Sequence, residues 1–171
     1  MKTVNRISAV IMVAFCLFTA SEIAAQNNKL IVLVRHTEKD ASVPNNPDPE
    51  LSAEGRERAQ RFMKMAKKYR PHEIFSTNFK RTRQTAEPMA EKRKKEIQTY
   101  DPAKQADLVA NIMASKNDRY LIVGHSNTIP ALANLIAKKE VFRNLLETEY
   151  GVFWVIRMKK GVLKKIEVFP Y

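Results

Sequence analysis

The chain has 171 residues, enough for one domain with a substantial hydrophobic core. Its 30 lysines and arginines against 18 aspartates and glutamates give a formal charge of +12, which is expected of a protein with anionic partners or of a lysine-rich surface in contact with solvent. The single cysteine, Cys16, excludes an intramolecular disulfide framework.

The N-terminal stretch has the pattern of a secretory signal peptide. Two basic residues precede an apolar run at residues 7–20, and Ala25 ends a short series of small residues before a polar stretch. The apolar run is shorter than the roughly 20 residues of a membrane-spanning helix, so we expect cleavage rather than anchoring. The sequence therefore predicts a signal peptide at residues 1–25, a single domain at residues 26–171, and export to the periplasm or the extracellular space.

The first element of the domain is a run of five apolar residues, 30–34, that leads directly into Arg35 and His36. Three of the five residues are β-branched, which predicts a buried parallel strand that presents polar groups at its carboxyl end. Residues 40–50 follow with three prolines, so we expect a loop there that covers the site near His36.

Two helices are predicted in the middle of the chain. Ser52 is a candidate N-cap for the first, whose buried face would carry Ala59, Phe62, Met63 and Ala66. A short strand at residues 73–75 leads into the second helix, which contains Arg81 and would bury Thr82, Thr85, Ala86, Met89 and Ala90.

A brief strand at residues 97–100 is followed by the turn at Asp101-Pro102 and by a third helix. The second fully buried strand, residues 120–123, leads into Gly124 and His125. A fourth helix follows, for which the candidate caps are Asn127 and Thr128.

The chain closes with two strands, residues 152–158 and 163–169, whose tight connection predicts an antiparallel hairpin at one edge of the sheet. Strands that alternate with helices favour the α/β class, here a three-layer α/β/α sandwich with a mostly parallel sheet. Ligands bind beyond the carboxyl ends of the strands in such sheets, so we expect His36 and His125 at the same edge.

Three segments together resemble the histidine phosphatase superfamily, the phosphoglycerate-mutase-like proteins of branch 1 and their small phosphohistidine-phosphatase-like members. They are the Arg35-His36 pair, the segment from Ser76 to Ala86 that contains Arg81, and Gly124-His125. The resemblance spans residues 30–130 and implies a phosphatase in which His36 takes the phosphoryl group.

The chemistry of these residues fits that role. Two guanidiniums, Arg35 and Arg81, can each hold two phosphoryl oxygens and stay charged at any working pH. His36 must be neutral to attack, whereas His125 can be held protonated by the bound phosphate and complete a cationic pocket. The backbone that follows His125 at the start of a helix, at Ser126 and Asn127, would add amide donors.

The sequence does not decide which residue is the general acid that protonates the leaving group. The resemblance points to the region after the third strand, where Asp101 stands. Glu38 lies two residues after the nucleophile and would contact the arginines or the substrate. Some small relatives act on phosphohistidine without such an acid, so Asp101, Glu38 and no acid at all remain alternatives.

No cofactor and no metal are expected, because two converging arginines would repel a cation and no metal-ligand spacing is present. The predicted partners are a small phosphorylated substrate and inorganic phosphate as product, with no specific nucleic acid and no stable membrane insertion after cleavage. One alternative is a mutase, which needs a lid to exclude water, and residues 40–50 are the longest candidate lid. The other is a non-catalytic module that binds phosphorylated ligands. The sequence does not identify the substrate or the oligomeric state.

Overall fold

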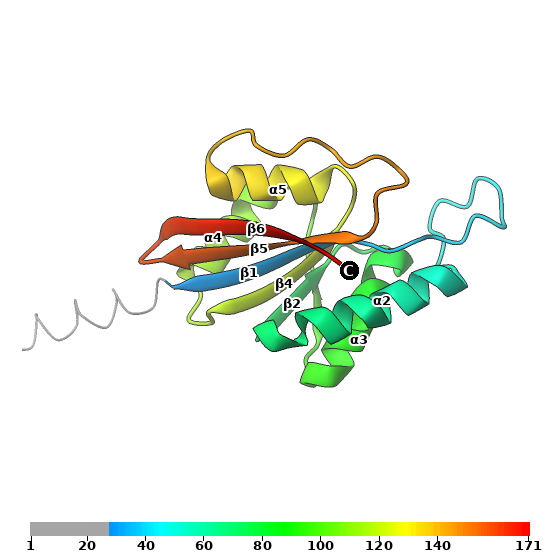
Figure 1. Ribbon diagram of the computed structural model, residues 1–171, viewed down its shortest axis with the longest axis horizontal. Coiled ribbons are helices and arrows are strands. Elements are labelled where there is room, and N and C mark those ends of the chain that lie inside the picture. Colours follow the sequence, from blue (N-terminus) through cyan, green and yellow to red (C-terminus); the bar gives the residue numbers. More distant parts are fainter. Residues whose placement is uncertain (1–27) are drawn as a thin grey trace, which may run out of the picture.

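The computed structural model describes residues 28–171, in which a six-stranded sheet has helices on both faces (Figure 1). The predicted signal peptide of residues 1–25 lies outside the described residues. Within residues 28–171, no helix has the length and apolar character needed to cross a bilayer.

The strands are arranged in the order β3-β2-β4-β1-β5-β6. Their bounds are β1 Lys29–Arg35, β2 Glu73–Ser76, β3 Ile97–Thr99, β4 Arg119–Gly124, β5 Val152–Lys159 and β6 Val162–Pro170. The first four strands of this order pair in parallel, whereas β5 is antiparallel to β1 and β6 is antiparallel to β5. The predicted α/β class with an antiparallel C-terminal hairpin is confirmed.

Within residues 28–171, four α-helices and one 3₁₀-helix complete the three layers. They are α2 Ala53–Ala66, η1 Lys67–Tyr69, α3 Lys80–Arg93, α4 Gln105–Ala114 and α5 Thr128–Ala137. Figure 1 shows α2 and α3 on one face of the sheet and α4 and α5 on the other. Two hydrophobic cores result, one on each face, and β1 supplies Ile31 and Leu33 to one and Val32 and Val34 to the other. Burial on both faces is the reason why residues 30–34 of this strand are all apolar.

Local chemistry fixes where these elements begin and turn. The Ser52 hydroxyl accepts a hydrogen bond from the amide of Gly55 and caps α2 as predicted. Gly55 itself is required by close packing, because a Cβ there would lie 2.1 Å from the carbonyl oxygen of Glu38. The hairpin turns at Lys160 and Gly161, whose φ angles of 52° and 72° belong to the two-residue turns that match the twist of the strands.

The segment between α5 and β5, residues 138–151, was not assigned to any element by the sequence, yet it has a defined path. It runs back over α5 towards the start of β5 (Figure 1). Buried Asn134 holds its first part, since the side-chain amide donates to Glu140 and to the Phe142 carbonyl while its oxygen accepts from the Val141 and Phe142 amides. The connection from β1 to α2, residues 36–52, is longer than this segment and contains the candidate lid predicted at residues 40–50.

Candidate active site

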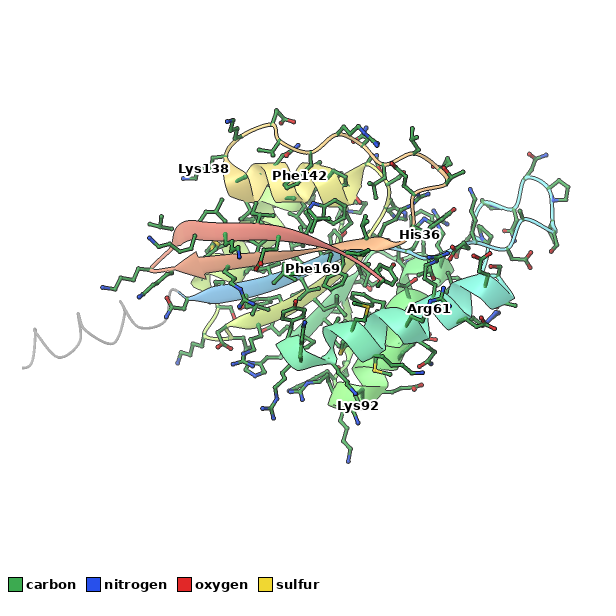
Figure 2. The ribbon with its side chains drawn as sticks, viewed as in Figure 1. His36, Arg61, Lys92, Lys138, Phe142 and Phe169 are labelled. Atoms are coloured by element: carbon green, nitrogen blue, oxygen red, sulfur yellow. The ribbon has the colours of Figure 1, made fainter. Side chains whose placement is uncertain are left out.

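Four of the predicted site residues meet at the carboxyl edge of the sheet. Arg35 ends β1 and His36 follows it, His125 follows β4, and Arg81 lies in the first turn of α3. The ring centroids of His36 and His125 are 5.4 Å apart with the rings edge to face. Figure 2 shows His36 at this end of the sheet, where the loop before α2 and the segment before β5 converge.

His36 has a buried side chain and a defined tautomer. Its Nδ1 atom lies 2.7 Å from the carbonyl oxygen of Thr37. Because a carbonyl oxygen can only accept, Nδ1 carries the hydrogen and the lone pair of the neutral ring is on Nε2. The main chain thus directs a nucleophilic nitrogen away from the Thr37 carbonyl.

Both imidazoles are neutral at pH 7. Burial lowers the pKa of His36 to about 3, the hydrogen bond to the Thr37 carbonyl opposes this change, and the charges of Arg35 and Arg81 add to it. Burial also lowers the pKa of His125 to about 4, with further contributions from Arg81 and Arg35. Desolvation and two nearby guanidiniums therefore keep the nucleophile unprotonated.

A chain of hydroxyl groups orients His125. Its Nε2 atom lies 3.0 Å from Thr77 Oγ1, which lies 2.9 Å from Thr82 Oγ1, and Thr82 in turn is 2.8 Å from the carbonyl oxygen of Phe79. The single hydrogen of the Thr82 hydroxyl is donated to this carbonyl, so Thr82 accepts from Thr77 and Thr77 accepts from Nε2–H of His125. The lone pair of neutral His125 is consequently on Nδ1.

The Arg35 side chain is only 1% exposed and is held from several sides. Its Nη1 donates to the carbonyl oxygens of Leu146 at 2.6 Å and Glu149 at 3.1 Å, and its guanidinium carbon lies 4.1 Å from the centre of the Tyr150 ring. Nε is buried without a partner in the described part of the chain, and Nη2 contacts Glu147 at 3.3 Å. The Nε–H and Nη2–H pair is the fork that binds carboxylate or phosphate oxygens.

Arg81 is more exposed, at 15%, and lies with its guanidinium carbon 4.4 Å from the centre of the Phe79 ring. Its Nη1 atom is 3.7 Å from an Asp48 oxygen. Burial lowers the pKa of Arg81, whereas the charges of Asp48 and Glu147 oppose that change. Glu147 is thus close enough to act on both guanidiniums.

The two candidates for the general acid are placed differently. Glu38 binds Arg58 through one carboxylate oxygen, and its other oxygen is buried with no partner within residues 28–171. Asp101 is exposed and accepts a hydrogen bond from the Ala103 amide, which closes the turn after β3. In the described part of the chain, no hydrogen bond or ion pair joins Asp101 to the four converging residues.

The backbone after His125 enters α5 as expected. Asn127 occupies the N-cap position without a side-chain capping bond, and it is the Thr128 hydroxyl that accepts from the His125 amide. The carbonyl of Ser126 accepts from the Leu145 amide, which attaches the 138–151 segment to the site. Gly124 is a close-approach position, because a Cβ there would lie 2.7 Å from the Tyr100 hydroxyl.

Sequence reasoning missed the residues that contact the two arginines and the one that orients His125. They are Asp48, Thr77, Phe79, Leu146, Glu147, Glu149 and Tyr150. Four of them belong to the 138–151 segment. The sequence does place this segment directly before β5. That position indicates that the segment lies near Arg35 only when β5 is known to pair with β1.

A metal site does not emerge from the described residues. Within residues 28–171, no group of three or more His, Cys, Asp or Glu side chains is arranged to hold a metal ion. The converging groups are two guanidiniums and two neutral imidazoles, a donor set that favours an anion.

Comparisons with known proteins identify the family and the fold. Residues 31–109 match the model of the histidine phosphatase superfamily (branch 1). No curated protein matches the sequence. Among solved structures, a mycobacterial glucosyl-3-phosphoglycerate phosphatase with inorganic phosphate is similar over 84% of this chain and 97% of its own, with a TM-score of 0.66 and 16% identity. The protein histidine phosphatase SixA with tungstate covers 82% and 96%, with a TM-score of 0.65 and 12% identity. Mycobacterial hydrolase 1 covers 84% and 99%, with a TM-score of 0.67 and 16% identity.

Proposed function

Because this chain belongs to the histidine phosphatase superfamily, we propose that it is a phosphohydrolase that transfers a phosphoryl group first to His36 and then to water. The observation that carries the proposal is the arrangement of two neutral imidazoles, 5.4 Å apart, close to the guanidiniums of Arg35 and Arg81. The phosphatases among its structural neighbours support the same class of reaction.

The first step uses the lone pair on His36 Nε2. It attacks phosphorus, a P–N bond forms, and the bond from phosphorus to the leaving group breaks with the electron pair going to the leaving group. The negative charge on the equatorial oxygens is met by the Nε–H and Nη2–H fork of Arg35 and by Arg81. Covalent capture divides one difficult displacement into two easier ones.

In the second step, water attacks phosphorus, the P–N bond breaks, and orthophosphate leaves. The phosphate group also changes the state of His125. Its pKa is low while only guanidiniums and protein surround it, and a nearby dianion raises the pKa because it offsets the charges of Arg81 and Arg35. The Thr77 hydroxyl keeps Nε2–H in place, so the additional proton is held on Nδ1.

The proposed reaction needs no metal ion, since the cationic groups that neutralise the phosphoryl oxygens belong to the protein.

The proposed location is outside the cytoplasm. The N-terminal pattern of basic, apolar and small residues supports export by a signal peptide. N-terminal sequencing of the exported protein is expected to begin after Ala25.

The test is hydrolysis of p-nitrophenyl phosphate in the presence of a chelator. We expect His36→Ala to lower kcat by roughly a thousandfold or more, because it removes the nucleophile. His72→Ala is the matched control, since His72 pairs with Asp118 before β2 and is expected to leave kcat unchanged. Quenching with alkali and detergent during turnover is expected to trap phosphate on His36, because the P–N bond survives alkali and is broken by acid. Undiminished turnover in His36→Ala would overturn the proposal.

The same assay separates the alternatives. A mutase would move the phosphoryl group between substrate molecules and release little free phosphate. A binding module would bind phosphate, show no turnover, and lose binding on the addition of salt. Release of one orthophosphate per substrate consumed supports the phosphohydrolase.

A further inference from the structure

Two exposed carboxylates contact the two guanidiniums of the site. Glu147, which is 70% exposed, lies 3.3 Å from Arg35 Nη2. Asp48, which is 37% exposed, lies 3.7 Å from Arg81 Nη1. Both carboxylates therefore lie on the solvent-exposed side of the converging residues, which we call the opening of the site.

The buried side of the pocket is formed by the nucleophile and by Arg35, both of which are at most 5% exposed. An in-line displacement places the leaving group opposite the attacking nitrogen. Attack from buried His36 thus directs the leaving group towards the opening. The leaving group consequently lies close to Glu147 and Asp48.

One lysine ammonium, that of Lys39, offsets part of the charge of Glu147, whereas within residues 28–171 no lysine ammonium pairs with Asp48. Lys39 is exposed and already lies 3.9 Å from Glu147. Lys80 donates its backbone amide to Asp48, and its ammonium group is 4.0 Å from Glu50. The cations at the opening are thus already in contact with acidic groups of the protein.

Several basic residues of the chain lie away from this opening. Basic residues occupy the ends of the helices, for example Lys68 in η1, Lys92 in α3 and Lys138 after α5. In a parallel α/β layer the helices end at the amino edge of the strands, opposite the site. Figure 2 shows Lys138 at the end of the molecule away from His36. The charge that the leaving group meets is therefore set by local residues.

We propose that Glu147 and Asp48 select substrates by the charge of the leaving group, so that phosphates whose leaving group is an amine cation or is neutral are preferred over those that carry a carboxylate or a second phosphate. This inference rests on the proposed function and assigns a substrate class to the same site. A carboxylate favours a nearby ammonium group and repels a nearby anion. At an exposed position each such contact changes the relative rate by about twofold to fivefold.

The test compares three substrates with leaving groups of two carbon atoms and different charge. They are phosphoethanolamine, 2-hydroxyethyl phosphate and phosphoglycolate. We expect kcat/KM to decrease in that order, by about tenfold over the series at low ionic strength. The differences are expected to shrink at high salt, because exposed charges are screened.

Two variants test whether the carboxylates of Glu147 and Asp48 cause this order of kcat/KM values. Glu147→Gln and Asp48→Asn are each expected to reduce the differences among the three substrates, and the double variant is expected to remove most of them. Glu57→Gln is the control with the same change of charge, since Glu57 is an exposed residue of α2 that contacts neither arginine. An unchanged order in the double variant, or a preference for phosphoglycolate in the unmodified protein, would overturn the inference.

Failure of the proposed function would look different. In that case p-nitrophenyl phosphate would not be hydrolysed at all, and the inference would be tested by calorimetric binding of the same three compounds. Binding to the His36→Ala variant is expected to follow the same order of affinity. Equal affinities for the three compounds would contradict the selection by charge.

Discussion

The site consists of two halves with the same chemical composition and different surroundings. The β1 half contains a guanidinium, an imidazole, an aromatic ring and a carboxylate, namely Arg35, His36, Tyr150 and Glu147. The α3 half contains the same four kinds of group, namely Arg81, His125, Phe79 and Asp48.

The two halves differ in burial and in the number of fixed contacts. Arg35 is 1% exposed and donates to two backbone carbonyls, whereas Arg81 is 15% exposed and contacts Asp48 at 3.7 Å. The pKa of His36 is lowered to about 3 and that of His125 to about 4, in both cases mainly by burial. The half that carries the nucleophile is therefore the rigid half, and the other half has room to adapt to the substrate.

The sharpest test of this difference exchanges each arginine for lysine. Arg35→Lys removes the fork that binds two oxygens and leaves the Leu146 and Glu149 carbonyls without their donor. We expect it to lower kcat/KM by about a thousandfold and the free energy of unfolding by about 2–3 kcal/mol.

Arg81→Lys is expected to lower kcat/KM by about tenfold to a hundredfold, because it too loses a planar guanidinium. Its free energy of unfolding should change by less than about 1 kcal/mol, since its ion pair with Asp48 is partly exposed. Urea unfolding together with steady-state kinetics measures both quantities. Equal destabilisation by the two variants would contradict the distinction between a rigid and an adaptable half.

The second test uses the pH dependence of stability. An unfolded histidine has a pKa near 6.5, and the pKa of folded His36 is about 3, so unfolding takes up a proton there between these values. Stability is fully present above about pH 6.5 and is lost as the pH falls towards 3. His36→Asn removes this group and should reduce the slope by up to about 1.4 kcal/mol per pH unit.

Urea unfolding at about pH 7, 6 and 5 measures this slope. His125→Asn is the matched comparison, and its effect should end nearer pH 4. Parallel pH profiles for the unmodified protein and His36→Asn would show that His36 is not held neutral by burial.

A third prediction concerns the hydroxyl chain behind His125. Thr77→Val keeps the volume but removes the acceptor for Nε2–H. We expect kcat to fall by about tenfold with a smaller change in KM, because the imidazole loses its fixed tautomer. Thr77→Ser should restore most of the activity. A loss of activity that serine does not restore would point to packing instead of orientation.

The smallest expected effect is at Tyr150. Tyr150→Phe keeps the ring that covers the Arg35 guanidinium and should change kcat/KM by less than about twofold. Tyr150→Leu removes the aromatic face and should lower kcat/KM by about threefold to fivefold. Steady-state kinetics on an aryl phosphate measures both. A large effect of the phenylalanine variant would instead assign a role to the hydroxyl.

The sequence by itself determined the elements and the ends at which polar residues emerge. Five apolar residues before Arg35 predicted a strand buried on both faces, and β1 has this pattern of burial. Ser52 predicted the start of α2, and the buried residues of α3 are the ones expected from helical spacing. These features depend on neighbours within one or two turns, so they are readable from local periodicity and capping.

Only the tertiary structure decided what surrounds the two arginines. The contact between Arg35 and the Leu146 carbonyl joins residues 111 positions apart. It exists because β5 pairs with β1 and because Asn134 fixes the path of the segment before β5. No local pattern encodes such a contact, since it depends on which strands become neighbours and on how a loop packs against them. For this reason the opening of the site, its carboxylates and the Tyr150 ring became visible only in the folded chain.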